Sequence, residues 1–218
     1  MKAGNERLAQ IPSGSVFLEG MLELPASAQG VVLFAHGSGS SRHSPCNNFV
    51  AARLREAGLG TLLIDLLTAE EDRDYERRFD IALLVERLHD AVRWLAAEKS
   101  TAGMRVGLFG ASTGAAAALQ LAAAVPSKVA AVVSRGGRPD LAGAVSLERV
   151  KAPTLLVVGG DDTEVLALNE GAYGHLRCPK SLFIVPGATH LFEEPGTLEV
   201  AASHAAEWFT RHLAPAMA

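Results

Sequence analysis

Short, largely apolar runs recur along this chain, and each is bounded by glycine or by polar residues. The clearest are Val31–Ala35, Gly60–Leu66, Val106–Phe109 and Thr154–Val158. Apolar runs of this length are typical of strands that are covered on both faces, as in parallel sheets. Segments with helical periodicity, such as Phe79–Ala97, separate them. The alternation predicts an α/β fold with a doubly wound, mostly parallel sheet and helices on both faces.

The remaining elements follow from the same periodicities. We expect further strands at Val16–Leu24, Val129–Ser134 and Ser181–Val185, and further helices at Phe49–Ala57, Thr113–Ala124, Val165–Leu176 and Thr197–His212. We expect the 218 residues to form a single domain, 1–218. The interval between Ser134 and Thr154 leaves little room for a helical lid, which favours an open, shallow site.

Charge and composition exclude several classes of function. The net charge is −4, so we expect neither nucleic acid nor a membrane surface as a partner. The start, Met1–Arg7, lacks the apolar core of a signal peptide, and the two cysteines, Cys46 and Cys178, follow no metal-ligand spacing. We therefore expect a cytoplasmic protein with free thiols, a monomer or homodimer whose partner is a small molecule.

A candidate nucleophile stands in the stretch Gly110-Ala111-Ser112-Thr113-Gly114. This stretch joins an apolar run to an alanine-rich run and has the G-x-S-x-G pattern of a nucleophile elbow. Only small neighbours fit beside the serine in so sharp a turn. The pattern places the Ser112 hydroxyl at the carboxyl end of a strand, where the amino end of the next helix also points.

A serine nucleophile needs a base, and the base needs a carboxylate that orients it. Among seven histidines, His190 is the best candidate because it follows the predicted strand Ser181–Val185 across a short loop. Asp161 and Asp162 follow the strand Thr154–Val158 in the same way. Either aspartate could orient the base on this evidence, and the chain order Ser, Asp, His is that of α/β-hydrolases.

An anionic intermediate needs preorganised donors, which form an oxyanion hole. We assign one donor to the backbone amide of Thr113 and the second to the amide of Ser38, with Gly37 or Gly39 as alternatives. Gly37, Ser38 and Gly39 belong to a glycine-rich loop directly after Val31–Ala35. We expect His36 to brace this loop rather than to take part in the chemistry.

Two arginine-bearing segments near the predicted site have open interpretations. Arg42 either rims the pocket and binds a substrate carboxylate, or belongs to a solvated turn in which Ser44 caps the next helix, with Pro45 at its first position. Arg135 and Arg138 follow the strand Val129–Ser134 at the same sheet edge, and contact of either with an anionic group is a secondary hypothesis.

Taken together, four motifs make the chain resemble an α/β-hydrolase of the dienelactone hydrolase-like group. They are His36-Gly37-x-Gly39, the elbow Gly110–Gly114, Gly159-x-x-Asp162 and Gly187-x-x-His190. They are specific for the superfamily and suggestive for the subgroup. The resemblance implies a Gly-x-x-Asp register, which favours Asp162 over Asp161 as the orienting carboxylate.

The resemblance also has a departure that bears on function. Dienelactone hydrolases proper use a cysteine nucleophile, whereas this chain has Ser112, and neither cysteine stands at an elbow. We therefore expect a serine hydrolase that cleaves small carboxylic esters without a metal or cofactor. The alternatives are a dienelactone, lactone or thioester hydrolase, and a catalytically silent hydrolase fold that acts as a binding module.

Overall fold

Eight strands form one sheet in the computed structural model, which describes residues 5–214. They are β1 (Asn5–Ser13), β2 (Val16–Leu24), β3 (Val31–Ala35), β4 (Gly60–Ile64), β5 (Val106–Ala111), β6 (Ala131–Arg135), β7 (Thr154–Gly159) and β8 (Lys180–Val185). Their order in the sheet is β1-β2-β4-β3-β5-β6-β7-β8. The first two strands are antiparallel to their neighbours and the other six are parallel. The prediction of a mostly parallel sheet is confirmed.

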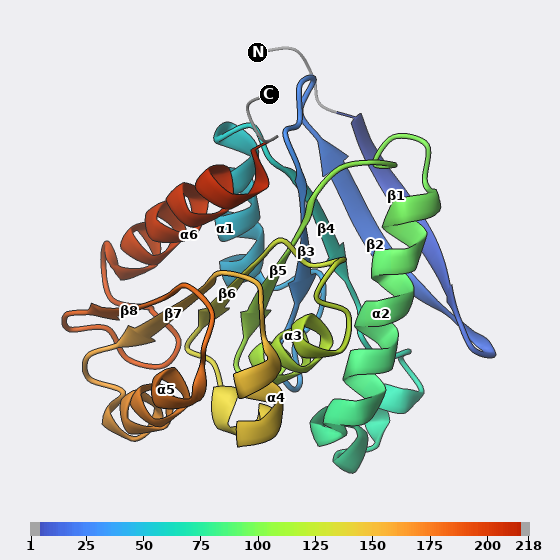
Figure 1. The fold of residues 1–218 in the computed structure, drawn as a ribbon. Helices are drawn as coiled ribbons and strands as arrows, with labels where there is room; N and C mark the ends of the chain where they lie inside the picture. The colour runs from blue at the N-terminus through green and yellow to red at the C-terminus, as the bar shows by residue number, and fades with distance from the viewer. Residues whose placement is uncertain (1–4, 215–218) are drawn as a thin grey trace.

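Helices cover both faces of this sheet, as predicted. They are α1 (Pro45–Glu56), α2 (Ile81–Ala97), α3 (Thr113–Ala124), α4 (Ala144–Arg149), α5 (Thr163–His175) and α6 (Thr197–Leu213). Three short 3₁₀ turns complete the elements: η1 (Glu71–Arg73), η2 (Glu76–Phe79) and η3 (Pro139–Ala142). Figure 1 shows α1 and α6 side by side to the left of the sheet and α2 to its right.

Alternate residues of the central strands divide the core into two layers. Leu33 and Leu108 pack in the layer that also contains residues of α2 and α3. Their neighbours Phe34 and Phe109 pack in the layer of α1 and α6, with ring centroids 4.8 Å apart. Successive strand residues point to opposite faces, so continuous apolar runs are needed to fill both layers.

Several elements differ from the sequence prediction, and among them η3 and α4 lie in an interval where no element was predicted. Strand β1 was not predicted, because its buried residues are Ala9, Ile11 and Ser13 whereas Leu8 is exposed, which obscures the alternation. Helix α1 begins at Pro45 rather than at Phe49, and the Ser44 side chain accepts a hydrogen bond from the Asn47 amide at 3.3 Å. The capped start of this helix is the second of the two interpretations given for the segment around Arg42.

The interval between β6 and β7 packs beside the sheet. Its elements η3 and α4 contribute Ala142 and Leu147 to the core layer that contains α3. Gln120 of α3 also donates a hydrogen bond to the Ala142 carbonyl at 3.2 Å. The interval therefore adds cover to one face of the sheet, consistent with a fold that has no lid domain.

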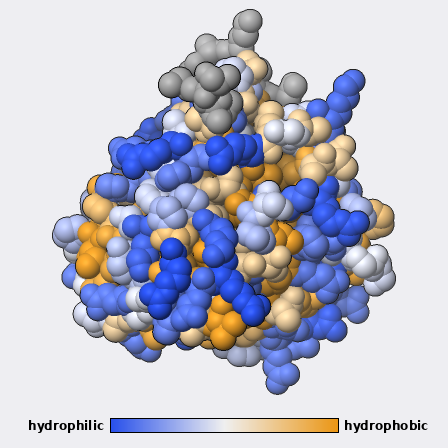
Figure 2. All heavy atoms as spheres, viewed as in Figure 1, coloured by the Kyte–Doolittle hydropathy of each residue, from blue (hydrophilic) through white to orange (hydrophobic). Residues whose placement is uncertain are grey.

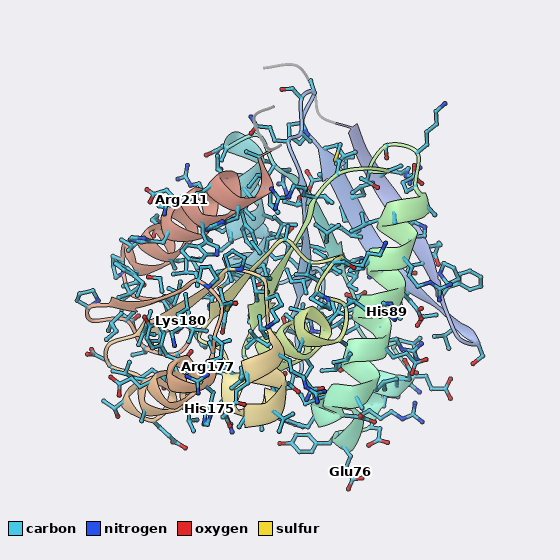
Figure 3. The ribbon with its side chains drawn as sticks, in the orientation of Figure 1. Glu76, His89, His175, Arg177, Lys180 and Arg211 are labelled. Atoms are coloured by element: carbon cyan, nitrogen blue, oxygen red, sulfur yellow. The ribbon has the colours of Figure 1, made fainter. Side chains whose placement is uncertain are left out.

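The surface around α5 is held by polar contacts. Lys180, which begins β8, donates hydrogen bonds to the carbonyls of Tyr173 and Leu176 at 2.6 and 2.8 Å (Figure 3). His175 at the end of α5 lies 3.7 Å from the Glu148 carboxylate of α4. Figure 2 shows hydrophilic and hydrophobic residues interspersed over the visible face.

The last two observations concern a signal peptide and membrane-spanning helices. The first four residues of the stretch Met1–Arg7, in which we expected no signal peptide, lie outside the described residues. Within residues 5–214, no helix combines the length and the apolar character that crossing a membrane requires.

Candidate active site

The predicted site residues follow the carboxyl ends of four strands in the parallel part of the sheet. His36 follows β3, Ser112 follows β5, Asp162 follows β7 and His190 follows β8. In an open α/β sheet, ligands bind beyond this edge. The topology therefore brings residues that are distant in the sequence to one end of the sheet.

Ser112 has the backbone of a nucleophile elbow. Its φ and ψ angles are 49° and −125°, which L-residues other than glycine rarely adopt. A Cβ on Gly110 would collide with the backbone of Ala115, and a Cβ on Gly114 would collide with the carbonyl of Ala35. Backbone strain of this kind costs about 1–3 kcal/mol and is concentrated at functional sites.

The turn also presents a helix amino end to the serine. Thr113 is the first residue of α3, and the first amides of a helix have no partner within the helix. The amide of Thr113 and the positive end of the helix dipole therefore lie next to Ser112. Negative charge on a group held by Ser112 is stabilised at this position.

His190 and Asp162 form a direct contact. The Nδ1 atom of His190 lies 2.7 Å from Oδ2 of Asp162. The Asp162 side chain is 13% exposed and the His190 side chain is 39% exposed, so the carboxylate is sheltered while the ring reaches solvent. Asp161 is exposed. Of the two aspartates that the residues alone left open, the structure brings Asp162 to the histidine.

Ser112 and His190 line one cavity of about 310 Å³. Gly37 and Ser38 also line it, so the loop after β3 forms part of its wall. The hydrogen bonds of residues 5–214 do not include one between the Ser112 hydroxyl and His190. The structure thus gathers the three side chains at one edge, with the imidazole bonded to the carboxylate and facing the cavity of the serine.

The loop after β3 contacts the elbow at two residues, Ser38 and Gly37. The Ser38 amide donates a hydrogen bond to Oγ1 of Thr113 at 3.0 Å. A Cβ on Gly37 would lie 2.9 Å from Cβ of Ser112, so only glycine fits there. Gly39, with a φ of 68°, lies outside the residues that line the cavity. The Ser38 amide is thus engaged by Thr113.

His36 is buried beneath this loop with both ring nitrogens bonded. The Leu66 amide donates to Nε2 at 3.0 Å, so Nδ1 carries the hydrogen and donates to the Gly37 carbonyl at 2.8 Å. Burial lowers the pKa of His36, although the Gly37 carbonyl and the charge of Asp65 oppose that effect. The ring is held neutral and ties the loop to the segment after β4.

Arg42 is engaged by carboxylates of the protein itself. Its guanidinium contacts Asp65 and lies 2.6 Å from Oε2 of Glu19, and its amide donates to Asp65 at 2.6 Å. Arg42 is absent from the residues that line the Ser112 cavity. The structure thus places this predicted binding residue in a structural ion-pair cluster.

Some residues of the cavity wall were not predicted from the sequence. Cys46, Asn47 and Leu191 line the cavity. The available signal for the first two was the cap at Ser44, which starts α1 early enough to bring them to the site. Of the two arginines that the sequence offered as a secondary hypothesis, Arg135 at the end of β6 lines the cavity and Arg138 does not. Both cysteines are free thiols, and residues 5–214 hold no group of metal-ligating side chains large enough for a metal ion.

A comparison with models of protein families identifies the family, and curated relatives extend the comparison. The model of the dienelactone hydrolase family matches residues 18–214. Two relatives from strains of Mycobacterium tuberculosis, each named "Putative phosphoribosyl transferase", are 56% identical over 204 residues. The match covers 94% of this chain and 46% of each relative, so the chain spans about half of their length.

Solved structures give the same picture. A dienelactone hydrolase from Anabaena variabilis is 54% identical, with a TM-score of 0.93 over 96% of this chain and 99% of that chain. Est1E from Butyrivibrio proteoclasticus is similar in fold, at 15% identity and a TM-score of 0.80 over 94% of this chain and 98% of that chain.

Proposed function

The chain belongs to the dienelactone hydrolase family, and from that premise we propose that it is a serine hydrolase which cleaves small carboxylic esters. Membership makes it a hydrolase with the α/β-hydrolase fold. The observation that carries the finer proposal is the serine at the strained elbow, whose cavity also receives the His190 ring bonded to Asp162.

The proposed reaction is a two-step acyl transfer. Asp162 accepts a hydrogen bond from Nδ1 of His190, which leaves Nε2 free to take the Ser112 proton. The serine oxygen then attacks the ester carbonyl, and the electron pair of the C=O bond moves onto its oxygen. Collapse of this intermediate breaks the bond to the alcohol, which leaves with the proton held by His190.

Water completes the cycle by the same route. His190 removes a proton from water, the hydroxide attacks the acyl-enzyme, and Ser112 leaves as the protonated alcohol. The oxyanion of each intermediate is stabilised by the Thr113 amide at the amino end of α3. The Ser38 amide supplies a second donor once the oxyanion competes with Thr113 Oγ1 for its hydrogen.

A lactone is the second candidate substrate. The Anabaena variabilis protein, at 54% identity, carries the name of a dienelactone hydrolase. A lactone is a cyclic ester, and the same nucleophile, base and oxyanion donors would open it.

We propose no transferase activity for this chain, because the mycobacterial relatives bearing that name are about twice its length.

Replacement of the nucleophile tests the proposal. Ser112→Ala should lower the turnover of p-nitrophenyl acetate by about 10³-fold or more, because it removes the proposed nucleophile, and the other hydroxyl of the elbow, Oγ1 of Thr113, is bonded to the Ser38 amide. Ser203→Ala, which removes an exposed hydroxyl on α6, is the matched control. A fluorophosphonate probe should label Ser112 of the wild type, and its failure to react would favour a silent binding module. Near-normal hydrolysis by Ser112→Ala would refute the nucleophile.

A further inference from the structure

Arg135 is a buried arginine without a carboxylate partner. It ends β6, lines the Ser112 cavity and is 8% exposed. Its Nε atom is buried and has no hydrogen-bond partner, and within residues 5–214 no ion pair includes Arg135. Its neighbour Arg138, in contrast, lies 2.8 Å from the Asp140 carboxylate. A charge that is buried at the site is thus left unpaired by the protein.

Leaving a guanidinium in this state is costly. Arginine is almost never fully buried unless it is paired, because removal from water disfavours the charged form. Burial accordingly lowers the pKa of Arg135, with only the nearby Cys46 opposing the effect. The Phe192 ring, whose centroid lies 5.3 Å from the guanidinium carbon, offers a cation–π contact. That contact offsets part of the cost, and it supplies no hydrogen-bond acceptor in the plane of the guanidinium N–H groups.

A second group of lining residues also favours negative charge. Ser44 and Cys46 line the cavity, and they stand at the amino end of the twelve-residue helix α1. The first turn of this helix contains no acidic residue. Pro45 has no N–H and the Asn47 amide donates to Ser44, so the Cys46 amide and the helix dipole are the groups that attract an anion there. None of the residues that line the cavity is an aspartate or a glutamate, so an anion in this space meets no charge of its own sign on the cavity wall.

We propose that the substrate carries a phosphate group, which binds between Arg135 and the amino end of α1. This inference rests on the proposed esterase function and names its substrate class. Residues that can donate hydrogen bonds line the cavity from two parts of the chain: Arg135 ends β6, and Ser40 and Ser44 belong to the loop that leads into α1. A planar carboxylate is satisfied by one arginine fork, whereas a tetrahedral phosphate accepts from several directions. The cavity, about 310 Å³, is large enough for a phosphate and a short ester.

Three acetyl esters of similar size test the substrate class. They are the acetyl esters of glycerol 3-phosphate, glyceric acid and glycerol, which carry a phosphate, a carboxylate and no charge. The wild type should hydrolyse the phosphate ester with a kcat/KM at least about tenfold above that of the neutral ester. Equal values for these two, or a higher value for the carboxylate ester than for the phosphate ester, would overturn the proposal.

A matched pair of variants tests the residue. Arg135→Gln should reduce the ratio of kcat/KM values, phosphate ester over neutral ester, by about ten- to a hundredfold. Arg138→Gln should keep that ratio, because its guanidinium is paired with Asp140 and does not line the cavity. An Arg135→Gln variant that retains the wild-type ratio contradicts the assignment.

Measurements without a variant of Arg135 keep the two proposals separate. Phenyl phosphate should inhibit the wild-type hydrolysis of p-nitrophenyl acetate competitively, and benzyl alcohol should inhibit it far less. An active esterase that is indifferent to phenyl phosphate overturns the phosphate site alone. If no ester is hydrolysed and the fluorophosphonate does not react, the esterase function fails. Phosphorus NMR of inorganic phosphate added to the protein, which needs no turnover, then decides the phosphate site: binding supports it and no binding overturns it.

Discussion

Two loops at the same edge of the sheet each carry a histidine, and the protein surrounds the two rings in opposite ways. In the loop after β3, His36 is buried and both of its ring nitrogens are bonded to backbone groups. In the loop after β8, His190 is bonded at Nδ1 alone, to Asp162, and its side chain is 39% exposed. The residue type and its place after a strand are shared, so the environment assigns the roles.

This difference teaches which histidine can move a proton. The ring of His36 can accept no proton without losing the bond from the Leu66 amide, and burial disfavours its charged form. His190 has a carboxylate beside its Nδ1 atom, and it lines the cavity that Ser112 also lines. We therefore infer a structural role for His36 and propose a chemical one for His190.

Replacing His190 should give the largest effect. His190→Gln removes the proposed base, and we expect the turnover of p-nitrophenyl acetate to fall by about 10⁴-fold. The side chain is partly exposed, so the free energy of unfolding should change by less than about 1 kcal/mol. Ester hydrolysis and urea unfolding measured on the same preparation check both expectations. A loss of activity that merely follows a loss of folded protein would contradict the proposed role.

The two adjacent aspartates offer a matched test of the orienting group. Asp162→Asn should lower turnover by about 10³- to 10⁴-fold, because an amide no longer stabilises the imidazolium or fixes its tautomer. Asp161→Asn should leave activity nearly unchanged, since Asp161 is exposed and His190 bonds to Asp162. Steady-state kinetics of both variants with one ester suffices. The reverse pattern, with the larger loss at Asp161, would assign the orienting carboxylate to the neighbouring residue.

Replacing His36 should affect stability more than chemistry. His36→Leu leaves the buried Leu66 amide without its acceptor, which we expect to cost about 1–3 kcal/mol of unfolding free energy. Turnover should fall by less than the about 10²- to 10³-fold cost of losing an oxyanion donor. Urea unfolding and ester hydrolysis compare the variant with the wild type. An activity loss as large as that of His190→Gln, with stability intact, would place His36 in the chemistry.

The fold and the position of each candidate side chain at a strand end could be predicted from the sequence. Both depend on local signals: continuous apolar runs, the glycines around Ser112, and short loops after the strands. Gly110 and Gly114 are informative because their neighbours leave no room for a Cβ. Glycine at these two positions therefore indicates a sharp turn in the sequence itself.

Contacts between distant segments could not be predicted in the same way. Ser38 and Thr113 are 75 positions apart. Neither segment contains a sequence pattern that predicts the hydrogen bond from the Ser38 amide to the Thr113 hydroxyl. The same holds for Arg42, whose charge suggested a substrate but whose partners are Asp65 and Glu19. Such pairings depend on the register and packing of the sheet, and these cannot be derived from a single sequence.

The smallest expected effect is on the pH dependence of the unfolding free energy, and it depends on the buried ring of His36. Because the folded protein lowers the pKa of His36, the folded state binds fewer protons than the unfolded state once the pH falls below the unfolded value of about 6.5. The stabilisation is therefore complete above that pH and is lost as the pH falls through the unfolded pKa toward the lowered folded one. Urea unfolding of the wild type and of His36→Leu at pH 7.5 and pH 5.5 measures the difference.

The comparison of the two proteins matters more than either curve, because carboxylates also weaken folding in acid. Between pH 7.5 and 5.5 the wild type should lose more unfolding free energy than His36→Leu, since the variant has no ring to protonate at that position. Equal losses would show that His36 titrates alike in the folded and unfolded states. The contrast with His190 would then rest on the bonds of the ring rather than on its charge.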